Sequence, residues 1–555
     1  EFPLFAITFL LAILDVLRVI HGGIINHYDI TIWGFTFCHL GFPALFSFAF
    51  AQLAYHFRYK IVRILCYGCP IILFTINIFS RINFGGPLTP QYIMAIGETN
   101  SQEATEFLST FLLCPHGLIV VLIVMATIAT CYLAEKYKRQ IVSMAERTHA
   151  RLVICAVSTV LFAFGCAHTP STYHLYQIKS MIQMEEWGGK YLRGMARAMS
   201  QDLYSNFMYS TYMPTVAGKQ MRESINISLS DNSCKTEAND SLNIVLVIGE
   251  SYIKAHSPLY GYYLNTTPIM KEERQKGDLF VFNNINTPYN TTSPTLRNFF
   301  SCNCMGLEED WGDNVFMPIL FKRSGYDVYF WDNQNIQQAN TWDFTLNSYL
   351  HNDKLASASY TAENAQPYQY DGDLINDFFE KRYSLNKNTL SIIHLWGQHV
   401  NAELRYPHTA KFNHFTADSV KVKHQWLTKE MRKKIAHYDN ATYYNDACMG
   451  KIFNHYRNAN AVIVYLSDHG EEIYDWRPSM GRKIDPMGKN VVKYQFDIPF
   501  VVWCSDKYKA KHPEIVKAIR AAVNKPMSSD ITCNMLFHLA GLKTKNYRQS
   551  LDILS

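Results

Sequence analysis

Five long apolar segments occupy roughly the first 170 residues and are separated by short polar loops. Each is close to the ~20 residues that an α-helix needs to cross a bilayer. They show little amphipathic patterning, whereas helices of soluble proteins usually carry one polar face. The pattern predicts five transmembrane helices, at roughly Phe2–Ile20, Ile32–Tyr55, Ile61–Ile78, Leu108–Leu133 and Leu152–Phe164.

The charges between these segments predict the orientation of the chain. Lysine and arginine accumulate in the cytoplasmic loops of membrane proteins. The loops around 22–31 and 79–107 hold only Arg81 between them, whereas the other two loops carry Arg58, Lys60, Arg63, Lys136, Lys138, Arg139, Arg147 and Arg151. We therefore expect these basic loops in the cytoplasm and everything after about residue 167 outside it.

Residues 167–240 have the composition of a connector. Met181–Met199 has helical character with mixed polarity, which suits a helix that lies along a membrane surface. Ser228–Ser241 is rich in Asn, Asp and Ser, as linkers are. The domains expected are a transmembrane domain over 1–166, this connector, and an exported domain over 241–555.

The exported part alternates short apolar runs with longer helical stretches. This alternation is typical of an α/β domain with a mainly parallel sheet. The expected strands are Ile244–Ile248, Leu279–Phe282, Tyr326–Trp331, Leu390–Leu395, Val462–Leu466 and Ile498–Trp503.

Overall composition excludes one function class and leaves one question open. A net charge of +5 spread over 555 residues, without a basic stripe interleaved with aromatic residues, does not indicate nucleic-acid binding. Of the 13 cysteines, six lie in the exported part, where an oxidising compartment permits disulfides. Their spacing does not define which cysteines pair.

Two of the predicted strands end in residues that bind metals. Asp468 and His469 follow the apolar run 461–466, and Glu250 follows the run 243–248. Because the carboxyl ends of parallel strands meet at one sheet edge, these side chains are expected to form one divalent-metal site. Oxygen ligands with a single nitrogen suit zinc, with manganese as the alternative. Without a metal, Glu250 would cap a helix and Asp468-His469 would form an ordinary turn.

A nucleophile is expected at the start of the segment Tyr289–Ser301. This segment follows a strand and opens an apparent helix, with Thr292 or Ser293 at the N-cap. Hydroxyl residues are favoured there for capping alone. The same position also suits catalysis, since a metal activates a hydroxyl and a helix N-terminus stabilises phosphate oxygens.

Other polar residues follow two further strands. His394 and His399 come after the strand at 391–393, where they could contact substrate phosphate, protonate a leaving group or hold a second metal. Asn333 and Gln334 follow the strand that ends at Trp331 and could donate hydrogen bonds to phosphate. Turn formation would explain these two amides as well.

The whole pattern resembles the membrane-bound phosphoethanolamine transferases of Gram-negative bacteria, in the alkaline phosphatase/sulfatase superfamily. The resemblance covers nearly the whole chain, and its most specific parts are Val247–Ser251, Tyr260–Pro268, His394–His399 and Ser467–Glu471. The segment Asn290–Leu296 is most similar to the branch that modifies the lipopolysaccharide core, although lipid A transferases share the architecture.

The resemblance implies a site and a reaction. One zinc ion, or two, would be held by Glu250, Thr292, Asp468 and His469, with Thr292 as the nucleophile. Phosphatidylethanolamine would donate phosphoethanolamine to Thr292, from which it passes to lipid A or a core sugar of lipopolysaccharide. The protein would then be a multi-pass protein of the bacterial inner membrane, surrounded by membrane lipids, with its catalytic domain in the periplasm.

The resemblance also extends to a loop between the third and fourth predicted spans. Glu98–Phe107 is similar to the family's periplasmic loop, which lies near the active site. Asn100 and Glu103 in this loop are therefore expected to contact substrate.

The chain departs from the family pattern in places. Many relatives have another histidine some ten residues after the Asp-His-Gly-Glu motif, but residues 472–496 contain none. The candidates to replace its positive charge are Lys483, Lys489 and Lys493. Lipid A transferases flank the nucleophile with cysteine, which is missing here, so Thr291 and Ser293 remain alternatives to Thr292.

Three other functions were compared with the sequence. Sulfatase activity is not expected, because threonine occupies the position of the Cys or Ser that sulfatases convert and Arg297 falls one place late. A phosphoglycerol transferase acting on a periplasmic glycan would use the same site. A non-catalytic lipid-binding membrane protein, such as a transporter or sensor, is disfavoured because the spans show no clear set of midplane polar residues beyond Asp15 and Arg18.

Overall fold

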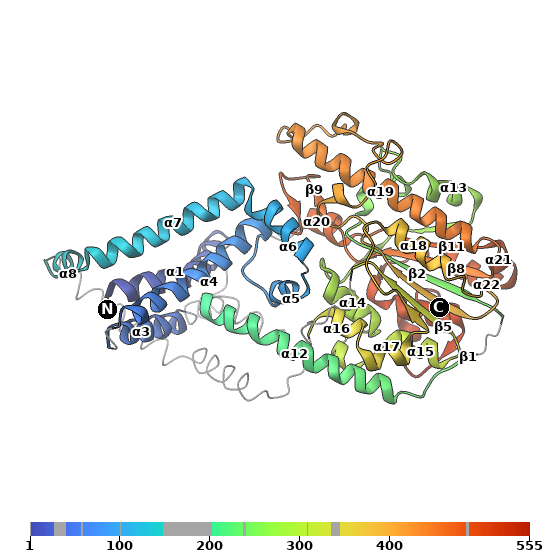
Figure 1. The fold of residues 1–555 in the computed structure, drawn as a ribbon, viewed down its shortest axis with the longest axis horizontal. Helices are drawn as coiled ribbons and strands as arrows, with labels where there is room; N and C mark the ends of the chain where they lie inside the picture. The colour runs from blue at the N-terminus through green and yellow to red at the C-terminus, as the bar shows by residue number, and fades with distance from the viewer. Residues whose placement is uncertain are drawn as a thin grey trace. The chain divides into compact units, whose positions relative to one another are not determined.

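The computed structural model describes residues 2–26, 40–56, 59–99, 101–147, 202–236, 240–307, 309–334, 344–483 and 488–555. The chain divides into two compact units, Glu1–Val216 and Ala217–Ser555 (Figure 1). The described part of the first unit is helical, and the second unit contains the sheet. The predicted fifth span, the predicted helix at Met181–Met199, and Asn100 lie outside the described residues.

Helices occupy the positions of the first four predicted spans. The helices of the first unit are α1 (Phe2–Asn26), α3 (Gly41–His56), α4 (Lys60–Phe84), α5 (Pro90–Glu98), α6 (Ser101–Phe107), α7 (Pro115–Lys136) and α8 (Lys138–Arg147). Of the described helices, α4 and α7 have the length and apolar composition to cross a membrane. In α1 and α3 the apolar stretches are shorter, Pro3–Leu14 and Pro43–Ala54. Among the described residues, two of the five predicted spans therefore correspond to helices that could cross a membrane.

The surfaces of α4 and α7 are apolar and open to the surroundings. Ile61 and Ile64 on α4 are each 67% exposed, and Leu118 and Leu122 on α7 are 60% and 61% exposed. Soluble proteins rarely leave so many large apolar side chains uncovered along one helix. Contact with lipid tails would remove this surface from water, which fits the predicted spans.

One long helix occupies part of the predicted connector. Helix α12 (Leu203–Ser230) begins after Asp202, whose Oδ1 accepts hydrogen bonds from the backbone N–H groups of Tyr204 and Ser205 at 3.1 and 2.9 Å. These bonds satisfy two of the free N–H groups at the helix start. The boundary between the two units falls within this helix, at Val216.

The second unit is built on a seven-stranded sheet with the order β3-β11-β8-β2-β7-β5-β6. Strands β8, β2, β7, β5 and β6 are parallel, whereas β11 runs antiparallel to both of its neighbours. The sheet is therefore mixed and mostly parallel. Its strands are β2 (Asn243–Gly249), β3 (Leu279–Phe282), β5 (Asp327–Asp332), β6 (Ala362–Glu363), β7 (Thr389–His394), β8 (Ala461–Ser467) and β11 (Phe500–Cys504).

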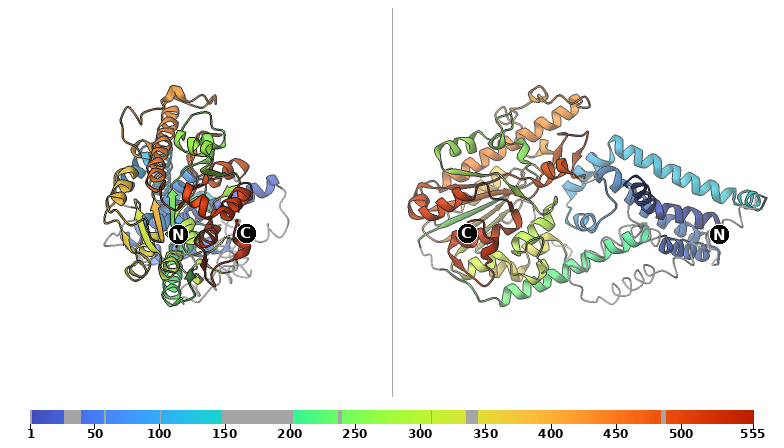
Figure 2. Two further views of the ribbon diagram at one scale, coloured as in Figure 1. Left: turned by 90° about the vertical axis from the view of Figure 1, so that its right-hand side faces the viewer. Right: turned by 180° about the vertical axis from the view of Figure 1, so that it is seen from behind.

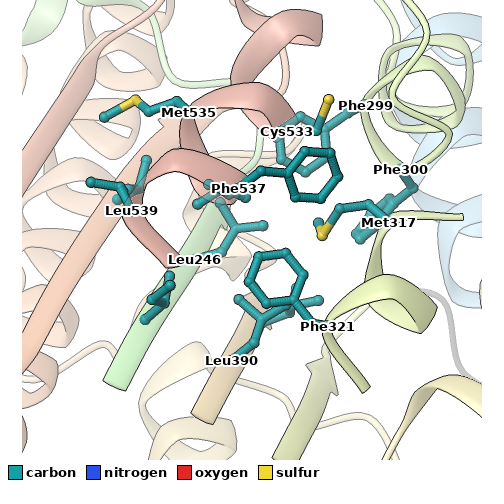
Figure 3. Packing of buried hydrophobic residues seen from close by; sticks show 14 of the residues in the cluster. Leu246, Phe299, Phe300, Met317, Phe321, Leu390, Cys533, Met535, Phe537 and Leu539 are labelled. Carbon is teal, nitrogen blue, oxygen red and sulfur yellow. The ribbon is translucent and has the colours of Figure 1, made fainter. Parts of the chain in front are cut away.

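Helices cover both faces of this sheet (Figures 1 and 2). Along β2, Ile244, Leu246 and Ile248 enter one core, and Val245 and Val247 enter the other. Side chains alternate between faces along a strand, so a strand apolar at every position is buried on both sides. Figure 3 shows the first core, in which Leu246 and Leu390 from the sheet pack near Phe321 and Phe537.

Different helices supply the two cores. The first core takes residues from α12, α14 (Thr292–Phe300), α15 (Met317–Arg323), α16 (Leu346–Leu350), α17 (Asp353–Ser359), α22 (Pro513–Ala522) and α23 (Thr532–Ala540). The second takes residues from α13 (Pro268–Lys276), α18 (Asp371–Glu380) and α19 (Lys429–Tyr456).

The parallel register brings four strand ends to the same level. Asp332 of β5 pairs with His394 of β7, and His394 pairs with Ile248 of β2. On the other side, Gly249 of β2 pairs with Ser467 of β8. The residues that follow these positions therefore emerge side by side at the carboxyl edge of the sheet.

A buried charged cluster joins the loop after β2 to α19. His256 Nδ1 lies 2.7 Å from Asp439 Oδ1, and its Nε2 lies 3.0 Å from Asp475 Oδ1. Burial by itself lowers the pKa of His256, but the two carboxylates raise it to about 10. The imidazole is therefore protonated at neutral pH, and its charge is matched within the protein.

This cluster makes stability depend on pH. The pKa of His256 is raised from 6.5 on folding, so its contribution is complete below pH 6.5 and is lost as the pH rises through 10. We expect the loss to approach about 1.4 kcal/mol per pH unit inside that window. The change His256→Gln should lower the thermal midpoint of the detergent-solubilised chain strongly at pH 6 and much less at pH 10.

The exposed His408 provides the control for this measurement, because His408→Gln should change the midpoint little at either pH. A destabilisation by His256→Gln that stayed the same from pH 6 to pH 10 would show that the charge of His256 is not what stabilises the fold.

Candidate metal centre

Three buried metal-binding side chains meet at the carboxyl edge of the sheet. Glu250 follows β2, and Asp468 and His469 follow β8. One ligand atom from each of them lies within 4.8 Å of the others, and all three residues are fully buried. The sheet register thus unites two segments that are more than 200 residues apart in the sequence.

The surrounding hydrogen bonds fix how the ligand atoms point. Asp468 Oδ1 accepts the backbone N–H groups of Ser251 (3.1 Å) and His469 (2.7 Å), whereas the buried Asp468 Oδ2 has no hydrogen-bond partner. The Ser251 hydroxyl donates to Glu250 Oε1 at 2.7 Å. His469 Nδ1 lies 2.9 Å from the carbonyl oxygen of Gly470.

The contact to Gly470 selects the tautomer of His469. A carbonyl oxygen can only accept, so Nδ1 carries the proton and the lone pair of Nε2 faces the carboxylates. Nε2 lies 3.3 Å from Glu250 Oε1 and 3.2 Å from Asp468 Oδ2. This is the arrangement that a metal-binding imidazole requires.

The charges at the centre also favour a cation. Burial, and then the neighbouring Glu250, raise the pKa of Asp468 to about 7. Two buried carboxylates in contact disfavour each other's charge unless a cation lies between them. One oxygen of Glu250, the unpartnered Oδ2 of Asp468 and one imidazole nitrogen of His469 therefore fit a zinc ion.

Thr292 brings a hydroxyl to the same centre. Its Oγ1 donates to Glu250 Oε2 at 3.1 Å and lies 3.3 Å from His469 Nε2. Helix α14 begins at Thr292, with Thr291 at the N-cap, so Thr292 is the first helical residue rather than the cap. The Thr291 side chain makes no capping hydrogen bond.

His394 lies at the end of β7 with one nitrogen held and the other available. Its Nδ1 is 3.0 Å from Asp332 Oδ1, and its buried Nε2 has no hydrogen-bond partner. Burial lowers the pKa of His394, but Asp332 outweighs this effect and raises it. Asp332 also lies 3.5 Å from His351, which in turn pairs with Glu363 at 2.9 Å.

The other predicted substrate residues differ in what they contact. Gln334 Nε2 donates to Glu250 Oε2 at 3.3 Å and to the carbonyl oxygen of Leu395 at 2.7 Å. Asn333 is fully buried and uses both ends of its amide, on Asp371 and on the backbone N–H of Tyr368. The structure therefore brings Gln334, but not Asn333, to the metal ligands.

His399 follows a tight turn against Glu250. Gly397 has a φ of +52°, and a Cβ there would lie 2.7 Å from the backbone nitrogen of Glu250. Desolvation lowers the pKa of His399 to about 3, so its ring is neutral at physiological pH. The buried Nδ1 of His399 has no hydrogen-bond partner.

Two predicted substrate residues belong to the first unit. Glu103 lies in α6. Asn100, which precedes this helix, is outside the described residues.

Sequence reasoning missed two contributors to the site. Arg482 Nη1 lies 2.9 Å from His469 Nε2, and Arg482 Nε lies 3.2 Å from Glu471 Oε2. Of the lysines expected to supply positive charge, Lys489 and Lys493 are exposed and line an open surface groove with Lys254. The sequence feature that indicated another positive charge at the site was the absence of a histidine from residues 472–496.

Comparison with known proteins gives concordant results. A family model described as Sulfatase matches residues 242–542. The chain is 27% identical over 445 residues to the phosphoethanolamine transferase EptC of Escherichia coli (strain K12), a match that covers 78% of this chain and 72% of that relative.

Two solved structures are similar as well. The zinc complex of the C-terminal periplasmic domain of EptC from Escherichia coli is 26% identical with a TM-score of 0.51, covering 58% of this chain and 88% of that one. The integral membrane lipooligosaccharide phosphoethanolamine transferase A (EptA) of Neisseria meningitidis shares the fold at a TM-score of 0.63 and 17% identity, covering 99% and 97%.

Metal binding should depend on these ligands. Removing the metal with EDTA leaves Glu250 and Asp468 facing each other, so we expect a lower thermal midpoint that added zinc restores. The change His469→Ala should weaken zinc binding at least about 10-fold, measured by competition with a chromophoric chelator. The exposed His408→Ala is the matched control, and equal zinc affinity in both variants would contradict the assignment.

Asp332 should hold His394 in place and keep it protonated. The change Asp332→Asn removes the carboxylate, so the pKa of His394 should fall, as measured by NMR of labelled histidine in the full chain. We expect the zinc affinity to change less than about 3-fold, because Asp332 acts on the site through its contact with His394. An unchanged pKa of His394 would exclude this role.

Proposed function

The chain belongs to the sulfatase family, and we propose that it is a membrane-bound, zinc-dependent phosphoethanolamine transferase with Thr292 as its nucleophile. The observation that carries this proposal is the position of the Thr292 hydroxyl, 3.1 Å from Glu250 and 3.3 Å from His469 within the candidate metal centre. The similarity to EptC supports the group that is transferred.

In the first half of the reaction, Thr292 takes phosphoethanolamine from phosphatidylethanolamine. A zinc ion held by Glu250, Thr292, Asp468 and His469 would act as a Lewis acid toward the threonine oxygen and the phosphoryl group. Thr292 Oγ1 attacks the phosphorus, and Glu250 accepts the hydroxyl proton. The bond from phosphorus to the diacylglycerol oxygen breaks in line with this attack.

The remaining site residues serve the leaving group and the phosphoryl oxygens. His394, which Asp332 orients and whose pKa Asp332 raises, donates a proton from Nε2 to the departing diacylglycerol oxygen. Gln334 and His399 contact the phosphoryl group. Asn333 supports them through Asp371, because its amide is already committed there.

The second half of the reaction repeats the displacement with another nucleophile. A phosphate or hydroxyl oxygen of lipid A or of the lipopolysaccharide core attacks the phosphorus of the phosphoethanolamine held on Thr292, and the bond from phosphorus to the threonine oxygen breaks. Glu250 returns its proton to that oxygen, and His394 takes the proton of an attacking hydroxyl. Donor and acceptor are both lipids, which explains why a catalytic domain is joined to apolar helices. We place the protein in the bacterial inner membrane, with five spans, a connector over 167–240, and the catalytic domain in the periplasm.

From the sequence resemblance we also propose that Asn100 and Glu103 contact the substrate. An amide can donate to phosphate, and a carboxylate can accept from the ammonium group of ethanolamine.

The nucleophile can be tested directly. The change Thr292→Ala should lower the rate of transfer at least about 1,000-fold, because no alkoxide remains to attack. Neither the phosphoethanolamine-modified peptide nor the mass gain on lipopolysaccharide should then be detected. Mass spectrometry of the trapped protein and of lipopolysaccharide measures both. Thr292→Ser should retain activity because it keeps the hydroxyl.

Thr291→Ala is the matched control, since Thr291 is adjacent and its side chain makes no capping hydrogen bond. Full activity of Thr292→Ala would refute the proposed nucleophile. A product heavier by phosphoglycerol would instead identify transfer to a different class of acceptor and donor.

A further inference from the structure

A β-hairpin carries a second charged pair to the metal centre. Strand β9 (Glu472–Ile473) pairs antiparallel with β10 (Met480–Gly481), with Gly481 opposite Glu472. The same register places Arg482 opposite Glu471, the residue that follows the metal-binding loop. Their side chains meet, with Arg482 Nε 3.2 Å from Glu471 Oε2.

Arg482 reaches past Glu471 to the metal ligand itself. Its Nη1 lies 2.9 Å from His469 Nε2, the nitrogen that faces Glu250 and Asp468. A guanidinium group only donates hydrogen bonds, so it occupies the lone pair that a zinc ion would take. When a metal holds this nitrogen, Nη1 remains beside the metal ligands, where it can donate to an anion bound at the centre.

We propose that Arg482 binds the phosphoryl oxygens of the substrate at the metal centre. This inference rests on the proposed transferase function. A planar guanidinium presents two donors to a tetrahedral phosphate and remains charged at every physiological pH. It therefore stabilises the negative charge that the oxygens carry while phosphorus is attacked.

The hairpin also contains the ion pair of Arg477 with Glu472, which serves as a structural comparison. Arg477 Nε and Nη2 both lie 2.7 Å from the two carboxylate oxygens of Glu472. Arg477 also donates to the carbonyl oxygen of Lys483. This pair is bidentate and closes the hairpin, whereas the Arg482 pair leaves Nη1 directed at the metal ligand.

Gln495 holds the hairpin beside the nucleophile. Its side-chain oxygen accepts from Asn290 at 2.8 Å, two residues before Thr292, and its Nε2 donates to Glu472 at 2.6 Å. The same Nε2 lies 2.9 Å from the carbonyl oxygen of Lys483, next to Arg482. The fully buried Gln495 thus fixes the distance between Arg482 and the Thr292 loop.

Phosphate binding to the zinc-loaded full chain in detergent tests this role. Inorganic phosphate is the probe, its affinity is measured by isothermal titration calorimetry, and zinc affinity is measured separately by chelator competition. We expect Arg482→Gln to weaken phosphate binding about 10- to 100-fold, because a charge-assisted pair is lost, and to change zinc affinity less than about 3-fold. Arg482→Lys should recover part of the phosphate binding, since lysine keeps the positive charge but lacks the two parallel N–H donors of a guanidinium group.

Arg477→Lys is the matched control, because it keeps a cation in the same hairpin and should leave phosphate affinity within about 2-fold. Unchanged phosphate binding in Arg482→Gln would overturn the inference. An equal loss of zinc and phosphate binding would also overturn it, because Arg482 would then only position His469.

The same preparations separate this inference from the proposed function. Wild-type protein incubated with phosphatidylethanolamine should form the phosphothreonine, and Arg482→Gln should form it about 10- to 100-fold more slowly. If the wild type forms none, the transferase proposal fails. If Arg482→Gln forms it as fast as the wild type, only the role of Arg482 fails.

Discussion

The parallel register of β5, β7, β2 and β8 is the constraint on which the site depends. It aligns Asp332, His394, Ile248 and Leu466, so the residues that follow them leave the sheet at the same edge. Side chains alternate along a strand, and a slip of one residue would turn these positions to the opposite face. Both faces of β2 are packed with apolar side chains, which makes such a slip costly. The hydrophobic core therefore sets the geometry of the metal ligands.

Buried charged groups are the second feature of this domain. Glu250 and Asp468 are fully buried beside His469, and Asp332 is buried beside His394. Each carboxylate is paired with an imidazole, which limits the cost of burial. The group at Glu250 also contains the Thr292 hydroxyl and the unpartnered Oδ2 of Asp468, which suits the reaction that we propose there.

The catalytic segments are held together from outside the sheet. Gln495 joins the loop before Thr292 to the hairpin that carries Arg482. Tyr438 of α19 accepts the backbone N–H of Ile253 at 2.9 Å and donates its hydroxyl proton to the carbonyl oxygen of Ser251. These buried contacts hold the segments that carry Glu250, Thr292 and Arg482 in place, as a preorganised site requires.

The sequence by itself determined the α/β class, six of the seven strands of the main sheet, and the grouping of Glu250, Asp468 and His469, because apolar runs that end in metal-binding residues are a local pattern. It also indicated Thr292, although the helix begins one residue earlier than expected, since several hydroxyl residues compete for a helix start. It did not indicate that β11 runs antiparallel to its neighbours, because strand direction depends on how distant segments cross over. Nor did it indicate that Asn333 turns to Asp371 or that Arg482, rather than a lysine, reaches His469. Those outcomes were decided by the tertiary structure, because a side chain's partner depends on which segments the packed sheet and hairpin bring within hydrogen-bond distance.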